Sequence, residues 1–153
     1  MKNKTLAVWL SFVAGPLGLH RFYLRGFGDL LGWFLPIPTA IGLYGVQRVK
    51  QFGLDDPWSW VLIPLLGFTV AGCALTAIVY GLMTPEKWNA KFNQAAPGVS
   101  STGTASAGDT SWLTIAAVVM SLFVGATALM ASIAYGFQGY FEYQIEESRK
   151  LSQ

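Results

Sequence analysis

Residues 58–83 read WSWVLIPLLGFTVAGCALTAIVYGLM and form the clearest apolar run of the chain. This run holds no charged residue. About 20 helical residues, each rising ~1.5 Å, are enough to cross the ~30 Å of hydrocarbon in a bilayer. Asp56 and Pro57 come directly before the run, and a carboxylate cap followed by a proline at the first helical position is a strong helix start. We therefore predict a transmembrane helix here.

The composition indicates a membrane protein over the whole length of the chain. Of the 153 residues, 53% are hydrophobic and only 12% are charged, whereas soluble domains carry about 25% charged residues. The net charge of +2 is too small to indicate a nucleic-acid partner. Because there is one cysteine and one histidine, the usual ligand sets of a metal site are absent. We expect the lipid bilayer as a partner, and neither a metal nor a cofactor.

Three further apolar segments approach the length of a membrane span. They run from Thr5 to about Leu19, from about Gly28 to Val46, and from Trp112 to about Phe137. The first of them is short, and it reaches full length only if its helix continues through Leu24. Together with residues 58–83, the segments predict about four transmembrane helices.

Two prolines interrupt the second apolar segment. Pro36 and Pro38 each remove a backbone donor and disfavour helix in the residue before them. We therefore expect either a kinked span or two half-helices. The fold class predicted from the sequence is all-α: an integral membrane helical bundle whose second helix is kinked at the prolines.

The chain divides near residue 50. Residues 1–50 are expected to form a two-helix transmembrane hairpin, and residues 51–153 to add two further transmembrane helices. In the second part, Trp88 and Phe92 share one face of a short helix that begins at Pro85. That pattern favours a helix in the membrane interface, and an ordinary polar extension is the alternative. Residues 95–111 are rich in Ser, Thr, Gly and Ala, which predicts a flexible loop. The residues from Glu142 onward are expected to form a polar tail, as a fraying helix.

An even number of spans places both termini on one side of the membrane. Under this arrangement six basic residues lie on the side of the termini and four on the other. Because Lys and Arg accumulate on the cytoplasmic side, we expect both termini in the cytoplasm and a location in the cell (inner) membrane. The six are Lys2, Lys4, Arg48, Lys50, Arg149 and Lys150, and the four are Arg21, Arg25, Lys87 and Lys91.

Residues 15–26 read GPLGLHRFYLRG and form the most distinctive short stretch. Its first two glycines allow a tight turn or a close backbone approach. The side chains of His20, Arg21, Tyr23 and Arg25 are candidates for contact with anionic lipid headgroups or with a partner. The alternative is that basic and aromatic residues here simply mark the membrane boundary.

This stretch resembles a known family. A glycine-rich helix end that leads into His-Arg-Phe-Tyr-Leu, between two apolar segments, is similar to bacterial members of the two-transmembrane-helix (TM-two) domain family. The resemblance covers about residues 4–48. It implies a membrane hairpin with the motif in its short connection, and no assigned activity. The chain departs from the family pattern in two places: Arg25 stands where a glycine is usual, and the region of Tyr44 to Arg48 lacks the usual acidic residue.

Small residues recur along one face of the last apolar segment. At 100° per residue their three- and four-residue steps place them within a stripe about 100° wide, and small residues let helices approach closely in lipid. We expect this stripe to pack against the bundle or a second copy of the chain; the alternative is that small residues are common in spans. The helix-packing candidates are Ala117, Ser121, Gly125, Ala128, Ser132 and Gly136 here, with Gly28 and Gly32 in the second segment.

No catalytic residues stand out. Paired carboxylates occur only at Asp55–Asp56 and Glu146–Glu147, where they are typical of a helix cap and a solvated tail. We therefore expect a non-catalytic interaction or scaffold module that packs with itself or with other membrane proteins. The alternative is a small transporter or channel component that uses the proline-interrupted segment.

Overall fold

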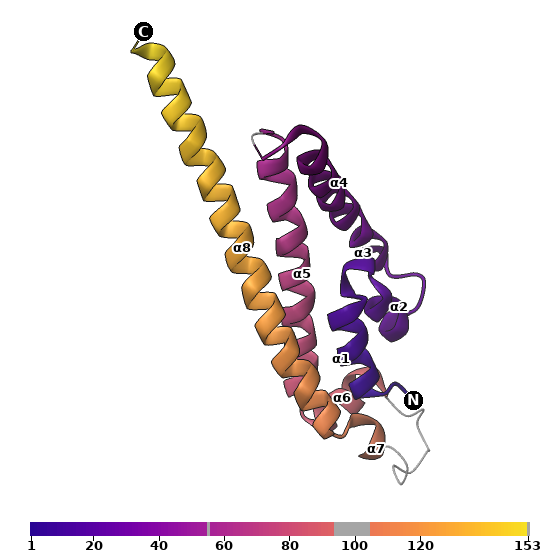
Figure 1. The fold of residues 1–153 in the computed structure, drawn as a ribbon. Helices are drawn as coiled ribbons and strands as arrows, with labels where there is room; N and C mark the ends of the chain where they lie inside the picture. The colour runs from indigo at the N-terminus through magenta and orange to yellow at the C-terminus, as the bar shows by residue number, and fades with distance from the viewer. Residues whose placement is uncertain (55, 94–104, 153) are drawn as a thin grey trace.

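The computed structural model describes residues 1–54, 56–93 and 105–152, and within these residues the regular structure is entirely helical (Figure 1). The long helices run roughly side by side, and the shorter ones gather near the N-terminus. The elements are α1 (Lys4–Val13), the 3₁₀ turn η1 (Gly15–Leu17), α2 (Leu19–Arg25), α3 (Leu30–Phe34), α4 (Pro36–Phe52), α5 (Ser59–Leu82), α6 (Pro85–Phe92), α7 (Ala105–Gly108) and α8 (Trp112–Leu151).

Three helical segments are long and apolar enough to cross a membrane. They are Leu30–Phe52, which joins α3 and α4, then α5, and then α8. The apolar residues of all three remain mostly exposed rather than buried inside the protein, as expected of helices whose outer faces meet lipid. The described residues are therefore all-α, and the three segments are compatible with a membrane protein. Three candidate spans are found, so the fourth expected span is not confirmed.

The first apolar segment forms a helical hairpin instead of one continuous helix. α1 has only 10 residues, which is about 15 Å of rise. Gly18 then adopts a left-handed conformation with φ 76°, and this reverses the chain. As a result, the backbone N–H of Asn3 donates to the Tyr23 hydroxyl at 2.8 Å, so the end of α2 lies beside the start of α1. The expected continuation of the first helix through Leu24 is therefore not what the chain adopts.

The prolines of the second segment separate α3 from α4. Pro36 is the first residue of α4, where its missing N–H is tolerated. Leu35 between the two helices keeps right-handed helical angles, φ −60° and ψ −38°. The hydroxyl of Thr39 donates to the carbonyl of Leu35 at 3.0 Å and to that of Pro16 at 2.8 Å. The start of α4 is thus hydrogen-bonded to the turn between α1 and α2. The expected kink stays a prediction.

The helix α8 is much longer than a single span. Its 40 residues rise about 60 Å, twice the ~30 Å of the hydrocarbon. Ser111 caps its start by accepting a hydrogen bond from the backbone N–H of Thr114. The polar tail from Glu142 continues the same helix and extends past the other helices in Figure 1.

The two termini lie at opposite ends of the bundle (Figure 1). The N-terminus is at the end formed by α2, α6 and α7, whereas the C-terminus is beyond the other end. The expectation of a shared side rests on an even number of spans and is not confirmed. The two parts divided at residue 50 also pack together, since α1 contributes Val8 to a buried cluster with Ala77 of α5 and Ala117 of α8.

The connection from α5 to α8 is partly described. α6 begins at a Thr84 cap, and its Trp88 is fully buried against Ala7 and Leu24 instead of facing lipid. Of the expected flexible loop at 95–111, residues 95–104 lie outside the described residues, and α7 occupies 105–108.

Candidate functional site

A cluster of charged side chains sits where α2 meets the start of α3. The Arg21 guanidinium makes two hydrogen bonds to Asp29, from Nε at 2.6 Å and from Nη2 at 3.3 Å. Arg25 approaches the same carboxylate at 3.9 Å. The hydrogen bond from Arg21 lowers the pKa of Asp29 below its usual value. Two arginines and one aspartate leave this end of the bundle with an excess positive charge.

His20 is buried directly behind this cluster. His20 is only 2% exposed, and its Nδ1 atom has no hydrogen-bond partner in the described part of the chain. A buried, unpartnered polar atom is costly, and among the described residues the hydroxyls of Ser121 and Tyr135 are in the same state. Ionisable groups at membrane depth are common markers of functional sites.

The other two members of the predicted headgroup or partner site have different surroundings. The hydroxyl of Tyr23 holds the backbone of Asn3, and its ring packs beside Trp88 and Leu24. The side chain of Arg25 is 51% exposed, which leaves it free to meet a headgroup or solvent. The structure thus brings His20, Arg21 and Arg25 together on α2 and uses Tyr23 to close the hairpin.

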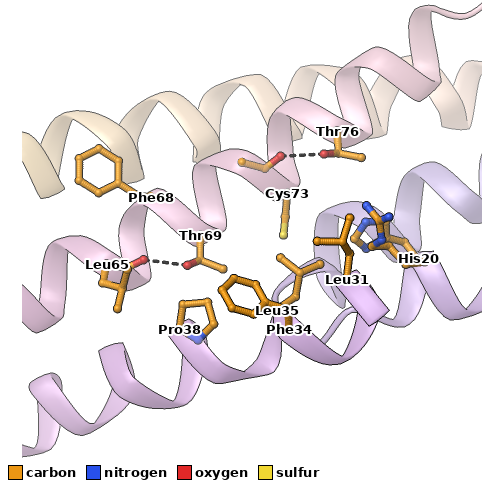
Figure 2. A pocket seen from close by; sticks show the side chains of 12 residues that line it. His20, Leu31, Phe34, Leu35, Pro38, Leu65, Phe68, Thr69, Cys73 and Thr76 are labelled. Atoms are coloured by element: carbon orange, nitrogen blue, oxygen red, sulfur yellow. Dashed lines mark hydrogen bonds between the residues drawn. The ribbon is translucent and has the colours of Figure 1, made fainter. Parts of the chain in front are cut away.

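An apolar cavity of about 490 Å³ lies between α2, α3 and α4 on one side and α5 on the other (Figure 2). His20 and Arg21 line it, together with apolar side chains and Cys73. Figure 2 shows His20 at one end and Phe68 at the other, with the Cys73 sulfur pointing inward. The thiol belongs to a buried residue, 3% exposed.

A second set of contacts, missed by sequence reasoning, anchors the N-terminus. Lys4 is fully buried, and its ammonium donates to the Met83 carbonyl at 2.5 Å and to the Thr110 hydroxyl at 2.7 Å. The carbonyl of Lys2 accepts from the Trp88 indole N–H at 3.0 Å. These partners lie about 80 to 110 residues away in the sequence, so no local pattern could have revealed them.

A second arginine–aspartate pair lies at the opposite end of the bundle. Arg48 donates to Asp56 from Nε at 2.8 Å and from Nη2 at 2.7 Å. Asp56 also accepts from the backbone N–H of Ser59 at 3.1 Å and from its hydroxyl at 2.6 Å. The helix start expected at Asp56 and Pro57 is wrong, because α5 begins at Ser59 with Trp58 as its N-cap residue. Asp56 nevertheless binds the first residue of α5, and through Arg48 it connects α4 to α5.

The small residues of α8 lie mostly against α5. Ala117, Ser121, Gly125 and Ser132 are buried, and Ala128 and Gly136 are half-buried. A Cβ added to Gly125 would lie 2.6 Å from the Cβ of Ala74, so the two helices are in close contact there. Gly28 and Gly32 have different surroundings. Gly28 is exposed with open space around it, whereas a Cβ on Gly32 would lie 2.6 Å from the Phe22 ring.

Sequence reasoning missed a second close helix contact. A Cβ added to Gly45 of α4 would lie 2.5 Å from the Cβ of Leu62, and one on Gly42 would clash with Leu66. The signal was present, because Gly42 and Gly45 follow the prolines at a three-residue step, which places them on one helix face.

The described residues contain no group of three or more His, Cys, Asp or Glu side chains able to hold a metal ion. No family model, curated protein or solved structure matches this chain. The resemblance to the two-transmembrane-helix family therefore stays a prediction.

Proposed function

We propose that this protein is a non-catalytic membrane module that acts by contact with other membrane proteins or with a second copy of itself, and that α8 is its contacting element. The observation that carries the proposal is the length of α8. Toward the C-terminal end of α8, a Cβ added to Gly139 would clash with Trp60 of α5, and Tyr143 lines a small cavity together with Pro57, just before α5. Beyond Tyr143 the helix continues to Leu151 with every described side chain exposed. Such a rigid arm outside the bilayer serves no purpose in the packing of the bundle.

The interior polar groups support a packing role over transport. The hydroxyls of Thr69, Thr76 and Ser132 each donate to a carbonyl of their own helix, four residues earlier. The proton of each of these hydroxyls is therefore used within its own helix. The ion pairs of the described residues lie at the two ends of the Leu30–Phe52 segment.

We further propose three spans and an N-terminal hairpin that enters the membrane without crossing it. With the hairpin folded back, six basic residues belong to the N-terminal residues, α2 and α6, and four belong to the C-terminal parts of α4 and α8. The positive-inside rule then places the N-terminus in the cytoplasm and the C-terminus outside. The six are Lys2, Lys4, Arg21, Arg25, Lys87 and Lys91, and the four are Arg48, Lys50, Arg149 and Lys150.

Site-specific photo-crosslinking in cells tests the contact role of α8. A photoreactive residue at Ile145, which is 52% exposed on the arm, should give a discrete protein adduct of fixed mass. The matched control is Val79 of α5, which is also 52% exposed and should crosslink to lipid only. Self-adducts would indicate a homo-oligomer, and another protein would indicate a scaffold. Absence of any protein adduct from Ile145 would contradict the proposal.

A further inference from the structure

The cavity beside His20 opens sideways, toward the surface that faces lipid. Its lining includes Leu31, Phe34 and Phe68, which are 53%, 59% and 49% exposed. Exposed apolar side chains around the mouth of a cavity in a membrane-spanning bundle face hydrocarbon, not water. A molecule dissolved in the bilayer can therefore enter without crossing the polar ends of the protein.

The cavity has the dimensions of one lipid tail. Along α5 it extends from Leu65 to Thr76, and this separation corresponds to about 16 Å of helix rise. One leaflet accounts for about half of the ~30 Å hydrocarbon thickness, so the two lengths agree. The volume of about 490 Å³ also falls within the ~300–1,000 Å³ typical of small-molecule sites.

The two ends of the cavity differ in polarity. The hydroxyls of Thr69 and Thr76 in the lining already donate to Leu65 and Gly72 of their own helix (Figure 2). The unpartnered polar atom at the cavity is the Nδ1 of His20. Arg21 lies next to it, and Arg25 follows one turn later on α2, near the N-terminal residues, since the backbone of Asn3 donates to the Tyr23 hydroxyl. Asp29 balances only one of these two positive charges.

We propose that this cavity binds one acyl chain of an anionic membrane phospholipid, with the ester region of the lipid at His20 and its phosphate at Arg21 and Arg25. A hydrogen bond from His20 Nδ1–H to an ester carbonyl satisfies the buried nitrogen. The excess positive charge on α2 selects an anionic headgroup over a zwitterionic one. The site depends on residence in a membrane, and it is independent of any protein contact made by α8.

Native mass spectrometry of the full chain in mild detergent tests this site with two probes, phosphatidylglycerol and phosphatidylcholine. The blocking variant is Thr69→Phe, which places a ring in the cavity. Its control is Thr127→Phe on the exposed side of α8. The two threonine hydroxyls make the same bond, each donating to the carbonyl four residues earlier at 2.8 Å, so the same group is lost in both variants.

The wild-type chain should retain one phosphatidylglycerol, bound about tenfold more tightly than phosphatidylcholine. Thr69→Phe should weaken that binding at least tenfold, and Thr127→Phe should leave it unchanged. His20→Leu leaves no protein group without its hydrogen bond, because Nδ1 has no partner. The variant should weaken the binding of both lipids about tenfold. Arg25→Gln should remove the preference for the anionic lipid. The proposal would be overturned if Thr69→Phe or His20→Leu retained phosphatidylglycerol as well as wild type does. It would also be overturned if the wild-type chain retained none. Neither result would affect the role of α8.

Discussion

Arg48 and Asp56, eight residues apart, are joined by two hydrogen bonds of 2.8 and 2.7 Å. Arg21 and Asp29, also eight residues apart, make the same pair of contacts at the other end of the Leu30–Phe52 segment. Each pair connects one helix to the start of the next, so the second apolar segment is held at both ends. Two parallel hydrogen bonds between a guanidinium and a carboxylate fix the relative orientation of the two side chains as well as their distance.

The two pairs predict that stability falls in acid. Arg48 and Ser59 hold the pKa of Asp56 well below its ordinary value, and Arg21 lowers the pKa of Asp29. A carboxylate with a depressed folded pKa stabilises the protein above its unfolded pKa of about 3.9, and this stabilisation is lost as the pH falls toward the folded value. Thermal unfolding in detergent should therefore show a falling midpoint below about pH 4.

Asp56→Asn isolates one of these contributions. The variant should unfold at a lower temperature than wild type at pH 7, and its midpoint should fall less on acidification. Glu147→Gln is the control, because Glu147 is exposed and makes no ion pair among the described residues. A wild-type midpoint that is constant from pH 7 to pH 3 would show that the pairs contribute nothing to stability.

The hairpin turn predicts a position-specific effect of adding one methyl group. Gly18 has φ 76°, and a Cβ there would clash with the carbonyl oxygen of Gly32. Gly18→Ala should therefore cost more than the ~1–2 kcal/mol of left-handed strain alone. Gly28→Ala should be close to neutral, because nothing lies within 4 Å of the added Cβ. Equal unfolding midpoints for the two variants would be inconsistent with the turn.

The contact between α5 and α8 predicts a second asymmetry. Gly125→Leu adds a side chain 2.6 Å from the Cβ of Ala74, and overpacking of this kind typically costs about 1–3 kcal/mol. Ala131→Leu adds similar bulk to an exposed position of α8 and should change little. Denaturant titrations of both variants give the comparison, and a fully stable Gly125→Leu protein would place this face of α8 away from α5.

Sequence reasoning located the long helices well. The run at 58–83 became α5, because the whole run is uncharged and long enough to span a membrane, and these are local properties of the sequence. The fold-back of α2 onto α1 was not predicted, because the sequence allows either a helix that continues to Leu24 or a tight turn at Gly15 and Gly18. The reversal depends on Gly18 meeting Gly32, a contact between separate helices. The polar end of α8 was expected as a fraying helical tail from Glu142, and the structure keeps it helical to Leu151.

The candidate site was only half visible in the sequence. The motif around His20 was recognised as distinctive, and its arginines were expected at a membrane boundary. The cavity was not expected, because its far wall comes from Leu65, Phe68 and Cys73 of a helix some 50 residues away. Apolar residues of this kind are indistinguishable from ordinary lipid-facing positions until α5 is placed beside α2.

The central claim is a three-span topology with the termini on opposite sides of the membrane. The direct test is a set of fusions to each terminus of the full chain, with green fluorescent protein reporting a cytoplasmic end and alkaline phosphatase an external one. We expect fluorescence only from the N-terminal fusion and phosphatase activity only from the C-terminal fusion. Fluorescence from both termini would restore an even number of spans and contradict the arrangement described above.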